Sequence, residues 1–241
     1  MKNIKFIGWS LVLLLLIGAI SCKKKVSGDG PVVTQPRNPA EFTRIELQID
    51  ATTYVTQEGP SKVTIEAQQN ILDIIETPVI GNELRIRYQH NKRVGSHAPV
   101  IVRISNPVIN GLDVDGSGDL LVTNALHTNA LDLDISGSGS IKAGEVVVTG
   151  PVSANISGSG GILALSGRAE SGSFKISGSG WIDLLPIECK TATADISGSG
   201  NIKTTVTQQL DARISGSGSV LYLGSPTIST KISGSGSVRK L

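Results

Sequence analysis

One short phrase occurs seven times in the sequence, and this repeat constrains the fold more than any other feature. The phrase is Ile or Val followed by Ser-Gly-Ser-Gly, with Asp in place of the first Ser in the first copy. Successive copies are 21, 21, 20, 20, 18 and 18 residues apart and begin at Val114, Ile135, Ile156, Ile176, Ile196, Ile214 and Ile232. A period near 20 residues is typical of a solenoid, whose units bury their apolar sides only by stacking on one another.

Apolar and polar residues alternate through each phrase with the period of a β-strand. Around the second copy, Leu131, Leu133, Ile135, Gly137, Gly139 and Ile141 share one parity, and polar residues fill the other. Such alternation predicts one buried and one solvent-facing side, and a helical period would scatter these positions. Two glycines on the buried side predict a tight corner between two strands, because no side chain fills the interior there.

Antiparallel hairpins are the main alternative to stacked corners. The near identity of successive units favours parallel stacking, in which equivalent residues lie beside one another. We therefore predict an all-β fold: a parallel β-helix-like solenoid of about seven SGSG-containing rungs over residues 111–241, with rungs about 4.8 Å apart. A β-rich region before it is expected to cap the first rung.

Stacking would also align the outward residue that precedes each Ile or Val. This column reads Asp113, Asp134, Asn155, Lys175, Asp195, Arg213 and Lys231. Lys175, Asp195 and Arg213 alternate in sign, so they can form a ladder of weak surface ion pairs. Asp113 and Asp134 are like-charged neighbours and form a candidate cation site, with two solvated carboxylates as the other interpretation. An EF-hand loop does not fit, because Asn124 stands where a Glu is required.

The N-terminus has the features of a secretory targeting signal. Residues 1–21 have two lysines and then an apolar run too short for a comfortable membrane span. Ala19-Ile20-Ser21-Cys22 resembles the lipobox of bacterial lipoproteins, which implies a lipidated Cys22; a plain secretory signal is the alternative. The prediction is a lipid-anchored protein of the cell envelope, at the outer membrane. The absence of acidic residues directly after Cys22 slightly favours the periplasmic side over the cell surface.

Two further regions precede the repeats. Residues 22–41 are rich in Gly, Pro and Ser and are predicted to be a flexible tether. Residues 42–110 contain short alternating runs between turn signals, so we expect a β-rich capping region. Within it, Asn70 and the apolar residues after it predict a short helix capped by Asn70 and ending before Pro78.

Composition argues against several classes of function. Removing Lys2 and Lys5 with the leader leaves 20 basic and 20 acidic residues, so charge gives no case for nucleic-acid binding. Cys189 has no disulfide partner if Cys22 carries lipid, and we expect a partly buried thiol. The phrases match no phosphate-loop or dinucleotide motif, no serine lies in Gly-x-Ser-x-Gly, and the histidines lie outside the phrases. We therefore expect no catalytic site, no cofactor and no bound metal.

Trp181 is the one aromatic residue that the alternation places on the outside of a repeat. Its slot is held by Asp119, Ser140, Gly161, Asn201, Ser219 and Ser237 in the other copies. An exposed indole there can stack on a sugar ring or a protein side chain. The alternative is that the indole only covers neighbouring glycines.

The order of motifs resembles a known family. Val63-Thr-Ile-Glu-Ala, Asn70-Ile-Leu-Asp-Ile-Ile-Glu-Thr and Gly81-Asn-Glu-Leu-Arg-Ile precede the repeated Ile-Ser-Gly-Ser-Gly. This arrangement is similar to the "putative auto-transporter adhesin, head GIN domain" family over residues 42–241, and the SGSG repeat is its specific part. The resemblance implies a β-helix-like fold on an envelope lipoprotein of Bacteroidetes-type bacteria.

These features favour a non-enzymatic lipoprotein, held to the membrane by its lipid, that presents a polar solenoid face to a protein or glycan. One alternative is a carbohydrate-active enzyme on a β-helix. Its only dense acidic group would be Asp113, Asp115, Asp119 and Asp134. A purely structural or regulatory periplasmic module is the other alternative.

Overall fold

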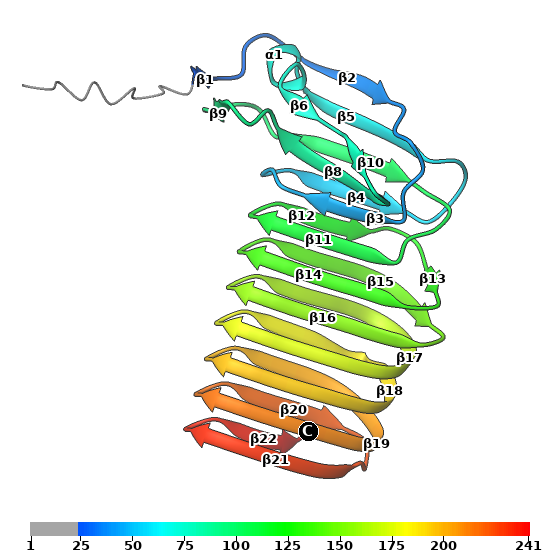
Figure 1. Ribbon diagram of the computed structural model, residues 1–241, viewed down its shortest axis with the longest axis vertical. Coiled ribbons are helices and arrows are strands. Elements are labelled where there is room, and N and C mark those ends of the chain that lie inside the picture. The colour runs from blue at the N-terminus through cyan, green and yellow to red at the C-terminus, as the bar shows by residue number, and fades with distance from the viewer. Residues whose placement is uncertain (1–23) are drawn as a thin grey trace, which may run out of the picture.

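The computed structural model describes residues 24–241 as a flattened rod of stacked strands with a cap at one end (Figure 1). The predicted signal peptide and Cys22 lie outside the described residues. Within residues 24–241, no helix has the length and apolar character needed to cross a membrane.

Two parallel sheets meet at the glycine corners. Sheet A contains the strands that enter the corners: β11 (Gly111–Gly116), β14 (Leu131–Gly137), β16 (Pro151–Gly158) and β21 (Thr227–Gly234). Sheet B contains the strands that leave them: β12 (Asp119–Val122), β15 (Ser140–Val148), β20 (Ser219–Leu223) and β22 (Ser237–Lys240). Three long strands leave one corner, bend and enter the next: β17 (Gly161–Gly178), β18 (Trp181–Gly198) and β19 (Asn201–Gly216). The short strand β13 (Leu126–Thr128) pairs with the end of β15.

All seven phrases stack in parallel and in register. Val114 pairs with Ile135, and the same position matches on every rung down to Ile232. The predicted parallel solenoid is confirmed, and the hairpin alternative is wrong. Where the period falls from 20 to 18 residues, β18 accommodates its longer turn in register shifts between Leu184 and Glu188 and between Cys189 and Thr191.

The corner requires glycine for two different reasons. The first Gly of a phrase has a positive φ, as at Gly137 (+126°), and its carbonyl accepts N–H groups from the next rung. Ser159 and Gly160 donate to the Gly137 oxygen at 2.9 and 3.1 Å. The second Gly is buried, and a Cβ at Gly160 would come within 3.0 Å of a carbonyl and of the Ile135 side chain. Stacking therefore satisfies the backbone groups of the bend and leaves no room for side chains inside it.

The cap is not stacked in chain order. Strands β3 (Arg44–Leu47) and β4 (Thr52–Thr56) form the rung next to β11 and β12. Strands β8 (Glu83–Tyr88) and β10 (Ile101–Ser105), although later in the chain, form the rung beyond them. Antiparallel strands then cover that edge: β2 (Val32–Arg37), β5 (Lys62–Gln68), β6 (Ile75–Glu76) and β7 (Val79–Ile80). Antiparallel pairing thus ends the parallel stack at this edge.

In the N-terminal part, the predicted flexible tether and the predicted Asn70 cap are wrong, whereas the predicted short helix is present. Much of the predicted tether is ordered, because β2 pairs with β5 and β1 (Lys24–Val26) pairs with β9 (Lys92–Val94). The predicted short helix exists as α1 (Gln69–Leu72), but its N-cap is Gln68, without a side-chain cap. Asn70 instead binds the Ser27 carbonyl and the Asp29 N–H. These long-range contacts leave no periodic trace in the sequence.

Within residues 24–241, the far end of the rod is open. Within the described chain, β21 pairs only with β19, and β22 only with β20. The inward side chains of the last rung have no layer beneath them, so Ile228 and Ile232 are 38% and 43% exposed. Lys231, Arg239 and Lys240 lie exposed on these edge strands, where charge disfavours edge-to-edge association.

Candidate functional site

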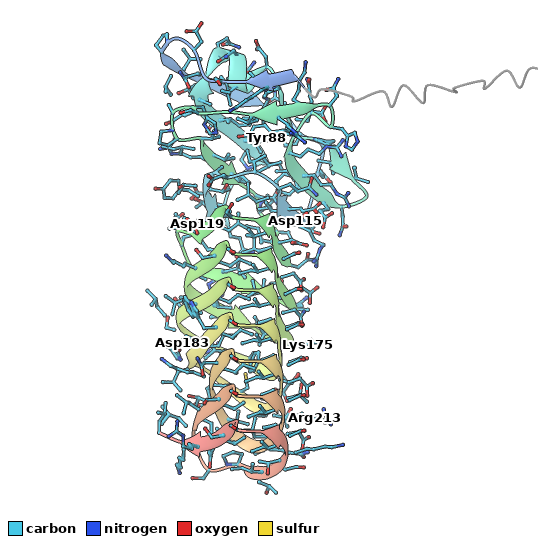
Figure 2. The ribbon with its side chains drawn as sticks, turned by 90° about the vertical axis from the view of Figure 1, so that its left-hand side faces the viewer. Tyr88, Asp115, Asp119, Lys175, Asp183 and Arg213 are labelled. Carbon is cyan, nitrogen blue, oxygen red and sulfur yellow. The ribbon has the colours of Figure 1, made fainter. Side chains whose placement is uncertain are left out.

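One column of outward residues on sheet A, formed by the residue before the Ile or Val of each phrase and by the cap residues aligned with it, is mostly charged and runs from the cap to the open end. Backbone register aligns, in order, Arg85, Glu46, Asp113, Asp134, Asn155, Lys175, Asp195, Arg213 and Lys231. The column is acidic next to the cap and mostly basic near the open end. Figure 2 shows Lys175 and Arg213 on one side of the rod and Asp119 and Asp183 on the other.

The predicted ion-pair ladder forms at one step only. Arg213 Nη1 lies 3.3 Å from Asp195 Oδ1, whereas Lys175, aligned with Asp195, makes no ion pair within residues 24–241. Because both partners of the Arg213 pair are substantially exposed, it contributes at most about 1 kcal/mol. Nearer the cap, Asn155 Nδ2 donates to Asp134 Oδ1 at 2.8 Å.

Arg44 gathers carboxylates from several rungs at the junction with the cap. Its guanidinium lies 2.8 Å from Asp132, 3.7 Å from Asp134 and 3.7 Å from Glu83. It occupies the space beside Gly111, where a Cβ would come within 3.0 Å of it. The sequence prediction missed this cluster because it did not place β3 beside β11.

Asp113 is left without a cation partner in the part of the chain that the structure describes. Burial first, and then the nearby Asp134, Glu46 and Glu83 carboxylates, raise the pKa of its carboxyl to about 6, against the lowering effect of Arg44. The predicted like-charge conflict in the column is therefore present. No three His, Cys, Asp or Glu side chains among residues 24–241 are arranged to hold a metal ion, and the Asp113–Asp134 cation site stays a prediction.

We expect Asp113→Asn to raise the free energy of unfolding at pH 7.5 and to leave it almost unchanged at pH 4. The folded state raises this pKa above its ordinary value of 3.8, so the wild-type protein loses stability as pH rises through about 6. Solvent screening limits the gain of the variant to about 1 kcal/mol. Urea denaturation at both pH values measures it, with Asp115→Asn as an exposed control. An equal gain at pH 4 would contradict an electrostatic cause.

Trp181 faces outward from sheet B between Gly161 and Asn201, the slot that the alternation predicts. Its indole lies over Gly161, where a Cβ would come within 3.0 Å of three indole atoms. The indole thus covers a glycine of the neighbouring rung, as the covering interpretation expects. It still remains 40% exposed, so part of the ring is available for contact.

A groove of about 450 Å³ adjoins this indole, and we call it the Trp181 groove. It is lined by Trp181, Ile182, Asp183, Asn201, Lys203, Ser219, Leu221 and Arg239. Lys203 Nζ lies 2.8 Å from Asp183 Oδ2, so the lining of the groove includes an ion pair. An aromatic surface beside amide, hydroxyl and charged groups can bind a sugar or a polar protein loop. Lys203 and Arg239 escaped the sequence prediction, although their alignment with Asp183 was a usable signal.

The four acidic residues of the enzyme alternative do not all converge, because Asp119 lies apart from Asp113, Asp115 and Asp134 (Figure 2). Asp115 and Asp119, on the two sides of the first corner, lie on opposite sides of the rod (Figure 2). The Asp119 carboxylate accepts a hydrogen bond from the Ser140 hydroxyl of the next rung. Asp115 and Asp119 therefore do not share the single acidic strip that the enzyme alternative requires.

Cys189 is fully buried, not partly buried as predicted. Burial, and secondarily the Glu188 carboxylate, raises the pKa of its thiol to about 11. The thiol is therefore protonated at neutral pH, a state that does not act as a nucleophile.

Comparison with known proteins supports the β-solenoid fold and identifies the family. A family model described as "Putative auto-transporter adhesin, head GIN domain" matches residues 41–226. A solved putative adhesin from Bacteroides fragilis is similar over 90% of this chain and 100% of its own, with 26% identity and a TM-score of 0.84. A putative lipid binding protein from Parabacteroides distasonis has the same coverage and identity, with a TM-score of 0.69. A putative adhesin from Parabacteroides merdae, at 20% identity and a TM-score of 0.72, shares the fold. No curated protein matches the sequence significantly.

Proposed function

Because the chain belongs to the putative auto-transporter adhesin, head GIN domain family, we propose that it is a non-enzymatic contact module of the cell envelope. The observation that carries the proposal is the in-register stacking of the seven phrases, which holds rows of polar side chains at fixed spacing on a stiff rod. Rigid repeated surfaces suit recognition because little conformational freedom is lost on binding. The Trp181 groove is the proposed contact point for a glycan or protein.

We further propose that a lipid on Cys22 anchors the rod by its capped end. The first described strand, β1, begins at Lys24 and pairs with β9 in the cap (Figure 1). Because β2 is also part of the cap, little chain is left to act as a long spacer after Cys22. An anchor there would hold the cap near the bilayer and point the open end away from it. Protease treatment of intact cells tests the side of the membrane, and resistance is expected for a periplasm-facing rod.

Trp181→Ala is expected to weaken glycan or protein binding about tenfold, as loss of about 1.4 kcal/mol of aromatic contact would. A glycan array first identifies ligands of the wild-type protein, and titration then compares the variant. Leu165→Ala is the matched control, because Leu165 is also exposed, at 66%, and lines no part of the groove.

Trp181→Phe should restore part of the affinity, since it returns an aromatic face. Thermal denaturation of all three variants separates lost contact from lost cover over Gly161. Equal affinity of Trp181→Ala and wild type would show that the indole only covers its neighbour. Turnover of a bound glycan would instead support the enzyme alternative.

A further inference from the structure

The part of the charged column nearest the open end borders a second groove, on the opposite side of the rod from Trp181. Its volume is about 380 Å³, and we call it the basic groove. Lys175, Arg213 and Lys231 bring three cations to it, and Asp195 brings the one carboxylate. We infer that the basic groove binds an acidic polysaccharide laid along the rod axis.

Charge selects an anionic ligand with more than one charged group. Asp195 is already engaged by Arg213, so Lys175 and Lys231 have no ion-pair partner among residues 24–241. Lys175 and Arg213 are two rungs apart, a separation of about 10 Å along the axis. A polymer that carries its charges along one line can therefore meet these cations in succession. Such complementarity accumulates over several charges, although each exposed contact is weak.

The same column limits where such a polymer can lie. Asp113 and Asp134 line a separate hollow nearer the cap, and Lys175 lies at the boundary of both. A polyanion would be repelled at the acidic end and held at the basic end. The proposed site is therefore confined to the four rungs nearest the open end.

A row of free hydroxyls favours sugar as the backbone of this ligand. Ser197, Ser215 and Ser233 line the groove in register, one rung apart. Their hydroxyls make no hydrogen bond within the described chain, so each can donate to and accept from a sugar hydroxyl. Ile176, Ile196 and Ile214 also border the groove, but their side chains are buried in the core, so the outward charged and hydroxyl groups make the contacts.

Other polyanions fit the groove less well. An acidic peptide would need partners for its own backbone, and beneath the groove β18 and β19 are paired on both sides, which leaves only the outer edge of β21 free. A nucleic acid would lack stacking surfaces, because none of the residues that line the groove is aromatic. A polyuronate chain needs only the charges and hydroxyls that the groove offers.

Biolayer interferometry of the full chain on immobilised polygalacturonate tests the inference. We expect saturable binding that weakens as NaCl is raised from 50 to 500 mM, because salt screens exposed charges. Neutral dextran should show no binding. Tighter binding to polyglutamate or to vesicles of anionic phospholipid than to polygalacturonate would overturn the assignment to a polysaccharide.

Two variants link any binding to this groove. Replacing Lys175, Arg213 and Lys231 together by Ser should weaken polygalacturonate binding at least tenfold. The control replaces Lys142, Arg168 and Lys190, which have exposed side chains outside the groove, by Ser and should change it less than about twofold. Asp195→Asn should tighten binding about threefold, because it removes the one carboxylate and frees Arg213. Equal losses in both triple variants, or weaker binding by Asp195→Asn, would overturn the site.

The inference does not rest on the proposed role of Trp181. Trp181→Ala leaves the basic groove intact and is expected to bind polygalacturonate like wild type. Failure of one contact therefore leaves the other testable. Thermal denaturation of each variant confirms that a lost signal does not come from unfolding.

Discussion

Gly178→Ala is expected to lower the free energy of unfolding by about 3 kcal/mol or more. Gly178 has a φ of +130°, a region open essentially to glycine alone, and forcing another residue into it costs about 1–3 kcal/mol. The added Cβ would also come within 3.0 Å of the Gly158 carbonyl oxygen. That oxygen accepts the N–H groups of Ser179 and Gly180 at 2.9 and 3.1 Å, so the clash disturbs the hydrogen bonds that join two rungs. Backbone on both sides is fixed by stacking and cannot move aside.

Gly144→Ala is the matched control. Gly144 lies in β15 without a positive φ, and a Cβ there meets nothing within 4 Å. The change should alter stability by less than about 1 kcal/mol, with either sign. Urea denaturation followed by circular dichroism compares the two variants with wild type. Similar midpoints for Gly178→Ala and Gly144→Ala would show that the corner tolerates a side chain.

Phe174→Ala is expected to cost about 3–5 kcal/mol, at the high end for a core truncation. Phe174 has the largest side chain among the fully buried residues of the described chain and is 1% exposed. Its ring fills the space of the missing side chain at Gly172, where a Cβ would come within 3.0 Å of the ring. The aligned residues on the rungs above and below are Ala154 and Ala194. Because these neighbours are small, they cannot fill the cavity.

Phe174→Leu should recover most of that loss, since it restores much of the buried volume. Leu165→Ala, on the same strand but exposed, should change stability by less than about 0.5 kcal/mol. Urea denaturation under identical conditions measures the free energy of unfolding of all three variants. A cost below about 1 kcal/mol for Phe174→Ala would show that the rungs can collapse around the cavity.

The repeated phrase by itself determined the solenoid. Each copy places Ile and Gly on one parity and Ser on the other, and a shift by one residue would expose every apolar side chain. Identical corners stack best on one another, which determines parallel pairing and the outward column through Lys175, Asp195 and Arg213. Parity likewise put Trp181 on the surface. These features follow from a local pattern that occurs seven times in the sequence.

Only the tertiary structure decided how the cap is built and what surrounds each surface group. β3 lies between β8 and β11, which brings Arg44 to Asp132, and the indole of Trp181 lies over Gly161. Likewise, β2 joins β5 in place of the predicted tether. These contacts join segments far apart in the chain that share no repeated pattern, and no local period encodes their pairing. Their arrangement is settled when the whole chain buries its apolar surface and satisfies its backbone together.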